Sequence, residues 1–172
     1  MIELERTFLA KHLPENLISA KKKEILDIYI PASAIHPNLR IRKNGDTYEM
    51  TKKKPINKDD PSQLRESTIR LNEHEFNDLS LIPGKKVRKI RHFYPHNNHT
   101  AQFDIFCDEL NGLVLIDFEF DSINEKDRFN MPDFCLVDIT KEDFIAGGML
   151  SGKSYQDIEK NLQKFNYKPI KF

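Results

Sequence analysis

Glu3-Leu4-Glu5 opens the chain with two carboxylates on either side of one hydrophobic residue. Because a strand alternates its side chains between two faces, this segment places both charges on one face and the leucine on the other. Three later segments repeat the arrangement, each with one sign of charge: Arg40-Ile41-Arg42, Lys89-Ile90-Arg91 and Asp117-Phe118-Glu119. If these strands share one sheet that closes on itself, the charges line its interior and the hydrophobic residues are covered from outside.

The same alternation is also typical of any half-exposed antiparallel strand with one solvated face. Solvated strands usually mix threonine, serine, lysine and glutamate, whereas each of these four segments keeps a single sign. The repetition favours a charged interior over four solvated faces. An interior with separate acidic and basic strands needs a polyanion and a cation inside it.

The rest of the chain reads as further strands joined by turns. Strand patterns cover residues 2–9, 24–30, 39–43, 46–53, 63–71, 85–94, 100–108 and 113–121, with a short one at 135–139. Asn44-Gly45 suits a two-residue type I′ hairpin, because both positions accept positive φ. We predict an α+β fold, an eight-stranded antiparallel β-barrel or tunnel with peripheral helices.

Helix signals lie between and after these strands. Asn72 with Glu75 reads as a capping box, and Ser154 with Asp157 as the start of a final helix. Thr140 with Asp143 suggests another helix start, and Gly147-Gly148 its end. A short helix or turn is expected near residues 14–20.

The length and composition restrict which class of protein this chain can belong to. The 172 residues predict a single domain over 1–172, and 38% hydrophobic residues with twelve Phe argue against disorder. Lys+Arg and Asp+Glu balance at 27 each, so no strong net field attracts nucleic acid or an anionic membrane. The N-terminus is charged and no stretch approaches the roughly 18 apolar residues of a membrane span, so we expect a cytoplasmic protein. Cys107 and Cys135 lack CxxC spacing and read as buried thiols.

Other motifs carry less weight. Lys52-Lys53-Lys54 lacks the interleaved aromatic residues of a nucleic-acid surface, and we expect no nucleic-acid partner. His92, His96 and His99 lie in or beside a polar turn without a matched zinc-ligand cluster. Gly152-Lys153-Ser154 does not follow a strand with phosphate-loop spacing and reads as a helix end followed by a helix start.

The acidic segments predict a metal site. Glu3, Glu5, Asp117 and Glu119 supply hard oxygen ligands of the kind that Mg²⁺ or Mn²⁺ prefers, and Asp138 on the late short strand is a candidate fifth ligand.

The basic segments predict a phosphate site. An arginine guanidinium group can donate two hydrogen bonds to phosphate oxygens, and lysines add positive charge. Five cations are more than a single phosphate group requires, so the expected ligand is a chain of phosphates. The expected set is Arg40, Arg42, Lys53, Lys89 and Arg91. Glu66 and Asp104 are expected to face inward as well, where they hold the arginines or reach the metal through water.

At these residues the sequence resembles the CYTH, or triphosphate tunnel metalloenzyme, family, whose opening signature is Glu-x-Glu-x-Lys. Segments along nearly the whole chain are similar to the family's strands in the right order: Glu3 to Leu9, Leu39 to Arg42, Met50 to Lys53, Lys89 to Arg91, Gln102 to Phe106, Gly112 to Glu119 and Val137 to Thr140. The resemblance implies an eight-stranded tunnel that binds triphosphate compounds with divalent metal. One departure is Thr7, which stands where the signature has lysine.

The leading hypothesis is metal-dependent hydrolysis of inorganic triphosphate or another small triphosphate, such as ATP or thiamine triphosphate. In this hypothesis Glu3 and Glu5 act with the five cations in catalysis, and a metal-positioned water attacks the terminal phosphorus. A nucleotide cyclase that makes cyclic AMP from ATP on the same scaffold is the first alternative. A non-catalytic polyphosphate- or nucleotide-binding module, suggested by Thr7, is the second.

Overall fold

A computed structural model describes residues 2–57 and 60–172, apart from the side chains of residues 2–3 and 60–63. The strands are β1 (Ile2–Ala10), β2 (Lys21–Ile30), β3 (Leu39–Asn44), β4 (Thr47–Asn57), β5 (Asp60–Leu71), β6 (Lys85–His96), β7 (His99–Phe106), β8 (Val114–Glu119) and β9 (Cys135–Asp138). The α-helices are α1 (Glu73–Leu79), α2 (Ile123–Arg128), α3 (Gly147–Leu150) and α4 (Tyr155–Gln163). Single 3₁₀ turns are η1 (Glu15–Ser19), η2 (Asp108–Leu110) and η3 (Asp143–Ile145).

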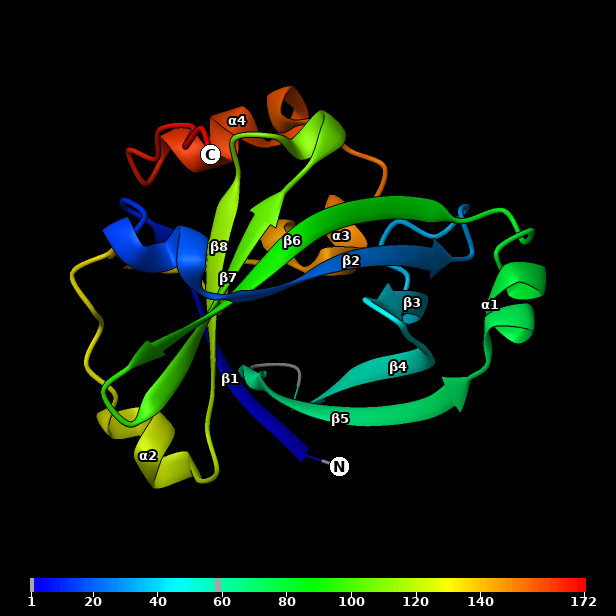
Figure 1. Ribbon diagram of the computed structural model, residues 1–172, viewed down its shortest axis with the longest axis horizontal. Helices are drawn as coiled ribbons and strands as arrows, with labels where there is room; N and C mark the ends of the chain where they lie inside the picture. The colour runs from blue at the N-terminus through cyan, green and yellow to red at the C-terminus, as the bar shows by residue number, and fades with distance from the viewer. Residues whose placement is uncertain (1, 58–59) are drawn as a thin grey trace.

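The strands form one antiparallel sheet in the order β5-β4-β3-β2-β6-β7-β8-β1-β9. The start of β1 also pairs with β5, with Leu4 opposite Gln63, so eight strands form a ring and β9 pairs with β1 beside it. Figure 1 shows the strands arranged around a central space, with α1, α2 and α4 on the outside. The predicted α+β fold with an eight-stranded antiparallel tunnel is therefore confirmed.

Strand parity follows the sequence prediction. Ile41 and Phe118, the hydrophobic centres of two charged segments, have no exposed surface and pack on the outer side of the ring. Ile41 lies under Phe76 of α1, and Phe118 packs against Phe8 and a further aromatic cluster. Covering the hydrophobic face from outside turns the charged face inward.

Local signals explain most element boundaries. The β3–β4 turn lies at Gly45-Asp46, because Asn44 still pairs with Thr47; only Gly45 has a positive φ, +58°, so the predicted type I′ turn on Asn44-Gly45 is wrong. The predicted capping box of Asn72 and Glu75 is formed at α1. Helix α2 was not predicted, although the Ser122 side chain accepts a hydrogen bond from the Glu125 backbone N–H and caps it. Across the described residues, no helix has both the length and the apolar character that crossing a membrane requires.

The prediction for residues 140–148 is wrong. Thr140 does not cap a helix, and Gly147-Gly148 begins α3 instead of ending one. A Cβ at Gly147 would overlap the Tyr29 hydroxyl, and a Cβ at Gly148 would overlap the Pro37 carbonyl. The two glycines thus allow α3 to approach the inner side of the ring closely.

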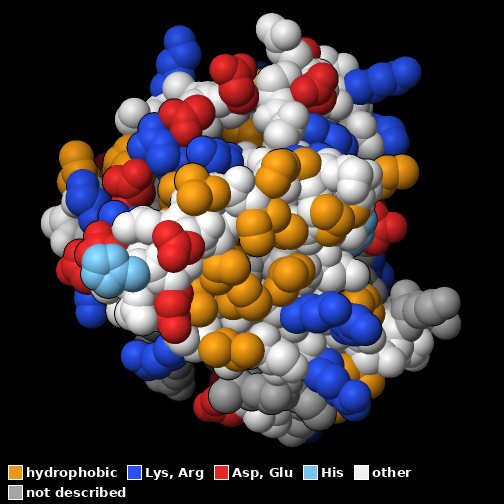
Figure 2. All heavy atoms as spheres, turned by 90° about the vertical axis from the view of Figure 1, so that its right-hand side faces the viewer, with side chains coloured by type: hydrophobic (Ala, Val, Ile, Leu, Met, Phe, Trp, Pro, Cys, Tyr) orange, Lys and Arg blue, Asp and Glu red, His pale blue; other side chains and the backbone are white. Residues whose placement is uncertain are grey.

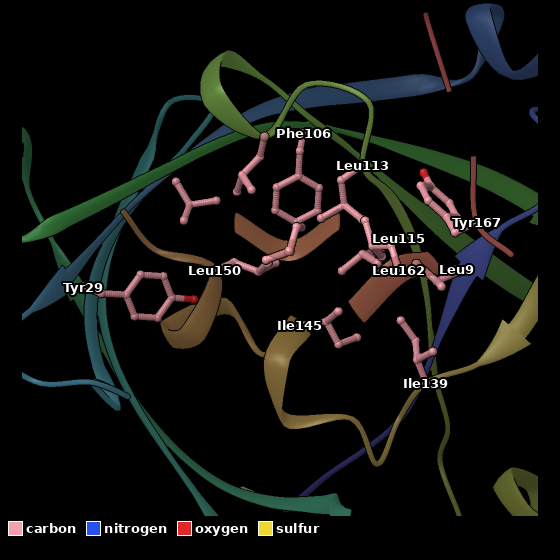
Figure 3. Close-up of a cluster of buried hydrophobic side chains, with 13 residues drawn as sticks. Leu9, Tyr29, Phe106, Leu113, Leu115, Ile139, Ile145, Leu150, Leu162 and Tyr167 are labelled. Carbon is pink, nitrogen blue, oxygen red and sulfur yellow. The ribbon is translucent and has the colours of Figure 1, made fainter. Parts of the chain in front are cut away.

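The segment that carries η3 and α3 fills one end of the ring with hydrophobic side chains. Ile145 and Leu150 point toward Tyr29, Phe106 and Leu115, which the strands project inward (Figure 3). All five belong to the largest buried cluster. The interior is therefore apolar at this end, and the charged residues occupy the remainder.

Candidate functional site

A cavity of about 900 Å³ occupies the charged part of the ring. Inward-facing side chains of all eight ring strands line it, together with residues of the η3–α3 segment. Ten of the twelve residues that the sequence singled out lie on its wall: Glu5, Arg40, Arg42, Lys53, Glu66, Lys89, Arg91, Asp104, Asp117 and Glu119. The side chain of Glu3 lies outside the described residues, so only its backbone pairing, opposite Leu64, is placed.

Asp27 anchors the two arginines of β3. Its carboxylate accepts hydrogen bonds from Arg42 Nε at 2.6 Å and Arg42 Nη2 at 2.8 Å, and lies 4.0 Å from Arg40 Nε. Burial alone would raise the pKa of Asp27, but the Arg42 and Arg40 guanidinium groups outweigh it and hold the pKa well below its usual range. One buried carboxylate thus fixes the planar guanidinium group of Arg42 and lies close to that of Arg40.

Asp104 anchors the cations of β6 in the same way. It accepts hydrogen bonds from Arg91 Nε at 2.6 Å and Arg91 Nη2 at 2.7 Å, and a third from Lys89 Nζ. Burial opposes its ionisation, yet the charges of Arg91 and Lys89 lower the pKa of Asp104 to about 2. Burial lowers the pKa of Lys89, against the opposing pull of Asp104.

The acidic wall is built by β1 and β8. Glu5 lies directly opposite Glu119, and Thr7 directly opposite Asp117. The Thr7 hydroxyl donates to Asp117 Oδ1 at 2.8 Å, and Arg91 Nη2 lies 3.1 Å from Asp117 Oδ2. Burial and the nearby Asp104 charge raise the pKa of Asp117. Like charges directly opposite on paired strands destabilise a sheet, and a cation between Glu5 and Glu119 would relieve this repulsion.

Lys53 extends the basic wall onto β4. Its ammonium lies 3.2 Å from Glu66 Oε2, and the Thr68 hydroxyl donates to Glu66 Oε1 at 2.7 Å. Burial would raise the pKa of Glu66, but these hydrogen bonds and the Lys53 charge lower it. Both Glu66 and Asp104 face inward as expected, but only Asp104 holds an arginine, Arg91, whereas Glu66 pairs with Lys53.

The sequence matches no protein-family model and no curated protein. Solved structures nevertheless share its architecture. The inorganic triphosphatase NE1496 aligns with a TM-score of 0.62 over 87% of this chain and 93% of its own, at 22% identity. A Bacillus halodurans protein provisionally assigned as an adenylate cyclase aligns with a TM-score of 0.52 over 99% of this chain and 92% of its own, at 15% identity. The chain shares the fold of these structures, and this is the tunnel fold that the resemblance to the CYTH family predicts.

A conserved hypothetical protein of Pyrococcus furiosus also shares the fold, with a TM-score of 0.52 over 73% of this chain and 82% of its own, at 18% identity. At these identities the likeness concerns the fold. The chemistry of the tunnel has to be argued from its own residues.

Asp138 lies apart from the acidic wall of the tunnel. It binds Arg6, with Nη2 at 2.6 Å from Oδ2, and accepts the Thr140 hydroxyl at 2.6 Å. Arg6 has the opposite strand parity to Glu5 and Thr7 and stacks over the rings of Phe8 and Phe129. Asp138 therefore faces the outer layer in this structure, away from Glu5, Asp117 and Glu119.

The charge inside the tunnel is strongly unbalanced. Its described lining contains the five basic residues named above and ten acidic ones: Glu5, Asp27, Glu49, Glu66, Asp104, Asp117, Glu119, Asp121, Glu142 and Asp143. A triphosphate would enter a net negative space unless cations accompanied it. The hard oxygen donors of β1 and β8 fit Mg²⁺ or Mn²⁺ in chemical type. The described side chains contain no group of three acidic, His or Cys residues close enough to hold a metal, so Glu3 or phosphate oxygens would have to complete the shell.

Sequence reasoning missed Asp27 and Gln102. Asp27 is the single carboxylate in the otherwise apolar run Leu26 to Ile30, and it lies on the same strand face as Tyr29. This isolated charge was the one signal in the sequence that could have indicated its role. Gln102 accepts a hydrogen bond from Arg91 and donates to Glu119 Oε1 at 2.9 Å. It therefore links the basic and acidic walls, and no charge pattern marks such a residue.

Proposed function

We propose that this protein hydrolyses inorganic triphosphate or another small triphosphate inside the tunnel. The observation that carries the proposal is the lining of the tunnel, which has five cations on one side and carboxylates on paired strands on the other. The tunnel fold that the chain has in common with the inorganic triphosphatase NE1496 supports the same activity.

The basic wall would bind the phosphates. Arg42, Lys89 and Arg91 are already held by buried carboxylates, so their donor groups need little reorganisation to meet an anion. Among the described side chains, Arg40 Nε is buried without a hydrogen-bond partner. A buried donor in this state loses free energy that a phosphate oxygen would restore.

The acidic wall would hold the metal through Glu5, Asp117 and Glu119, together with Glu3. When bound, Mg²⁺ or Mn²⁺ polarises phosphate oxygens and supplies an activated water as the nucleophile. Removing the charge of the acidic wall would therefore act on the chemical step. Removing the charge of the basic wall would act first on binding and on stabilisation of the pyrophosphate that leaves.

Cyclisation of ATP is the second candidate. The volume of about 900 Å³ lies in the range of sites that hold organic ligands. The tunnel fold is also that of the Bacillus halodurans protein with the provisional cyclase assignment. In this reaction the ribose hydroxyl replaces water as the nucleophile and pyrophosphate leaves.

A substrate screen tests the proposal. The full chain is incubated with inorganic triphosphate, ATP or thiamine triphosphate, with Mg²⁺, with Mn²⁺ or without metal, and phosphate, pyrophosphate and cyclic AMP are measured. We expect phosphate and pyrophosphate in equal amounts from inorganic triphosphate, only with metal. Cyclic AMP from ATP would establish the cyclase, and binding of every compound without turnover would establish a binding module.

A further inference from the structure

The side of the ring that carries α1 exposes an unusual number of hydrophobic side chains. Ile35 is 82% exposed, Leu81 81%, Ile69 64% and Ile82 43%. Together with the partly buried Met50 they define what we call the apolar face. Figure 2 shows hydrophobic side chains gathered in the middle of this side of the molecule. Exposed apolar groupings of this kind mark interaction surfaces.

Strand register and loop contacts bring these residues together. Met50 of β4 lies directly opposite Ile69 of β5, on the outer side of the ring. The Ala32 N–H donates to the Pro83 carbonyl at 3.3 Å, which joins the loop of Ile35 to the loop after α1. Helix α1 covers Ile41 but leaves Ile69 exposed.

One border of the apolar face is acidic. Helix α1 exposes Glu73, Glu75 and Asp78 and has no basic residue in its last turn. In Figure 2, acidic side chains border the hydrophobic group on the left, and basic ones border it at the lower right.

The opposite border is basic. Lys54 lies directly opposite Arg65 on β4 and β5, both are exposed, and Lys52 projects from the same side of β4. Within the described part of the chain, none of these three has a carboxylate partner. At about 3.3 Å per residue, Arg65 lies about 20 Å along β5 from the end that leads into α1, with Ile69 between them.

We propose that the apolar face is a two-fold interface between two copies of this chain. A two-fold axis through its centre places the acidic α1 of each copy against the basic end of β4 and β5 of the other, with hydrophobic residues between them. An anionic membrane or a nucleic acid fits less well, because it would meet the carboxylates of α1. The proposal does not depend on what the tunnel binds.

Two charge reversals test the interface in the full-length protein. Lys52→Glu with Lys54→Glu makes both borders acidic, and Glu73→Lys with Asp78→Lys makes both borders basic. We expect the wild type to sediment as a dimer in a concentration series, each double variant to sediment as a monomer, and an equimolar mixture of the two variants to form a heterodimer. Restoration in the mixture excludes misfolding as the reason for monomer formation.

A hydrophobic substitution and a matched control complete the experiment. Leu81→Lys should abolish the dimer, whereas Ile18→Lys, at a residue 70% exposed on η1, should leave it intact. Unchanged thermal melting of the monomers at low concentration would show that both variants fold. A wild type that stays monomeric at every concentration overturns the proposal, and so do double variants that fail to associate when mixed. Sedimentation of such a monomer with phosphatidylcholine vesicles would assign the apolar face to a lipid surface instead.

Discussion

Replacing Asp27 by asparagine should destabilise the fold by far more than an ordinary surface change. Asp27 is only 2% exposed and is the nearest countercharge of Arg42, while Arg40 Nε lies 4.0 Å away. Asparagine preserves the shape but leaves buried guanidinium charge without compensation. Breaking a buried ion pair from one side costs about 3–5 kcal/mol. Glu49, 4.0 Å from Arg42, supplies some countercharge, so we expect the lower end of that range.

Urea unfolding at neutral pH measures this difference, with Asp78→Asn on α1 as the matched control. A loss of about 3 kcal/mol corresponds to about 6–12 °C in melting temperature for a chain of this size. The exposed control should stay within about 0.5 kcal/mol of the wild type. Adding Arg42→Gln to Asp27→Asn should recover part of the loss, because the unpaired charge is removed. A loss below about 1 kcal/mol for Asp27→Asn alone would refute the idea that this carboxylate fixes the basic wall.

Three further predictions concern the tunnel. The pKa of Asp104 is lowered to about 2, so its charge stabilises the fold above about pH 4. This contribution is lost as the pH falls toward 2. The urea midpoint measured from pH 6 to 2 should therefore drop less steeply for Asp104→Asn than for the wild type. Glu5→Gln with Glu119→Gln should abolish metal-dependent turnover yet strengthen metal-free triphosphate binding in calorimetry, because two repelling charges are gone; weaker binding would contradict this. Thr7→Lys should raise triphosphate turnover with little change in melting temperature, since it adds a cation beside Asp117; unchanged or lower turnover would show that the site works without one.

The charged walls could be predicted from the sequence because strand parity is a local property. Arg40 and Arg42 share a face wherever the strand lies, and the buried Ile41 between them decides which face turns inward. By the same parity Arg6 lies outside the tunnel, where it binds Asp138. The contacts of Asp138 depend on how β9 pairs with β1. The position of Asp138 in the sequence does not reveal that pairing.

The apolar end of the tunnel could not be predicted, because it depends on contacts between distant segments. Gly147 permits α3 to pack against Tyr29, yet a pair of glycines is equally typical of a helix end. The count of acidic residues on the wall was also missed. Asp27 and Glu49 face the cavity from strands without a like-charge pair, so the sequence understated the acidic excess of the interior.

Phosphate release from inorganic triphosphate tests the central claim most directly, comparing the wild type with the variant Arg40→Ala, Arg42→Ala at saturating Mg²⁺ or Mn²⁺. Lys43→Ala is the matched control, because Lys43 follows Arg42 on β3 but is exposed on the other face. We predict that the wild type and the control release one phosphate and one pyrophosphate per triphosphate, and that the double variant loses at least about 100-fold in kcat/KM, as expected for two charge-assisted contacts. Equal turnover by all three proteins, or none by the wild type with either metal, would contradict hydrolysis inside the tunnel.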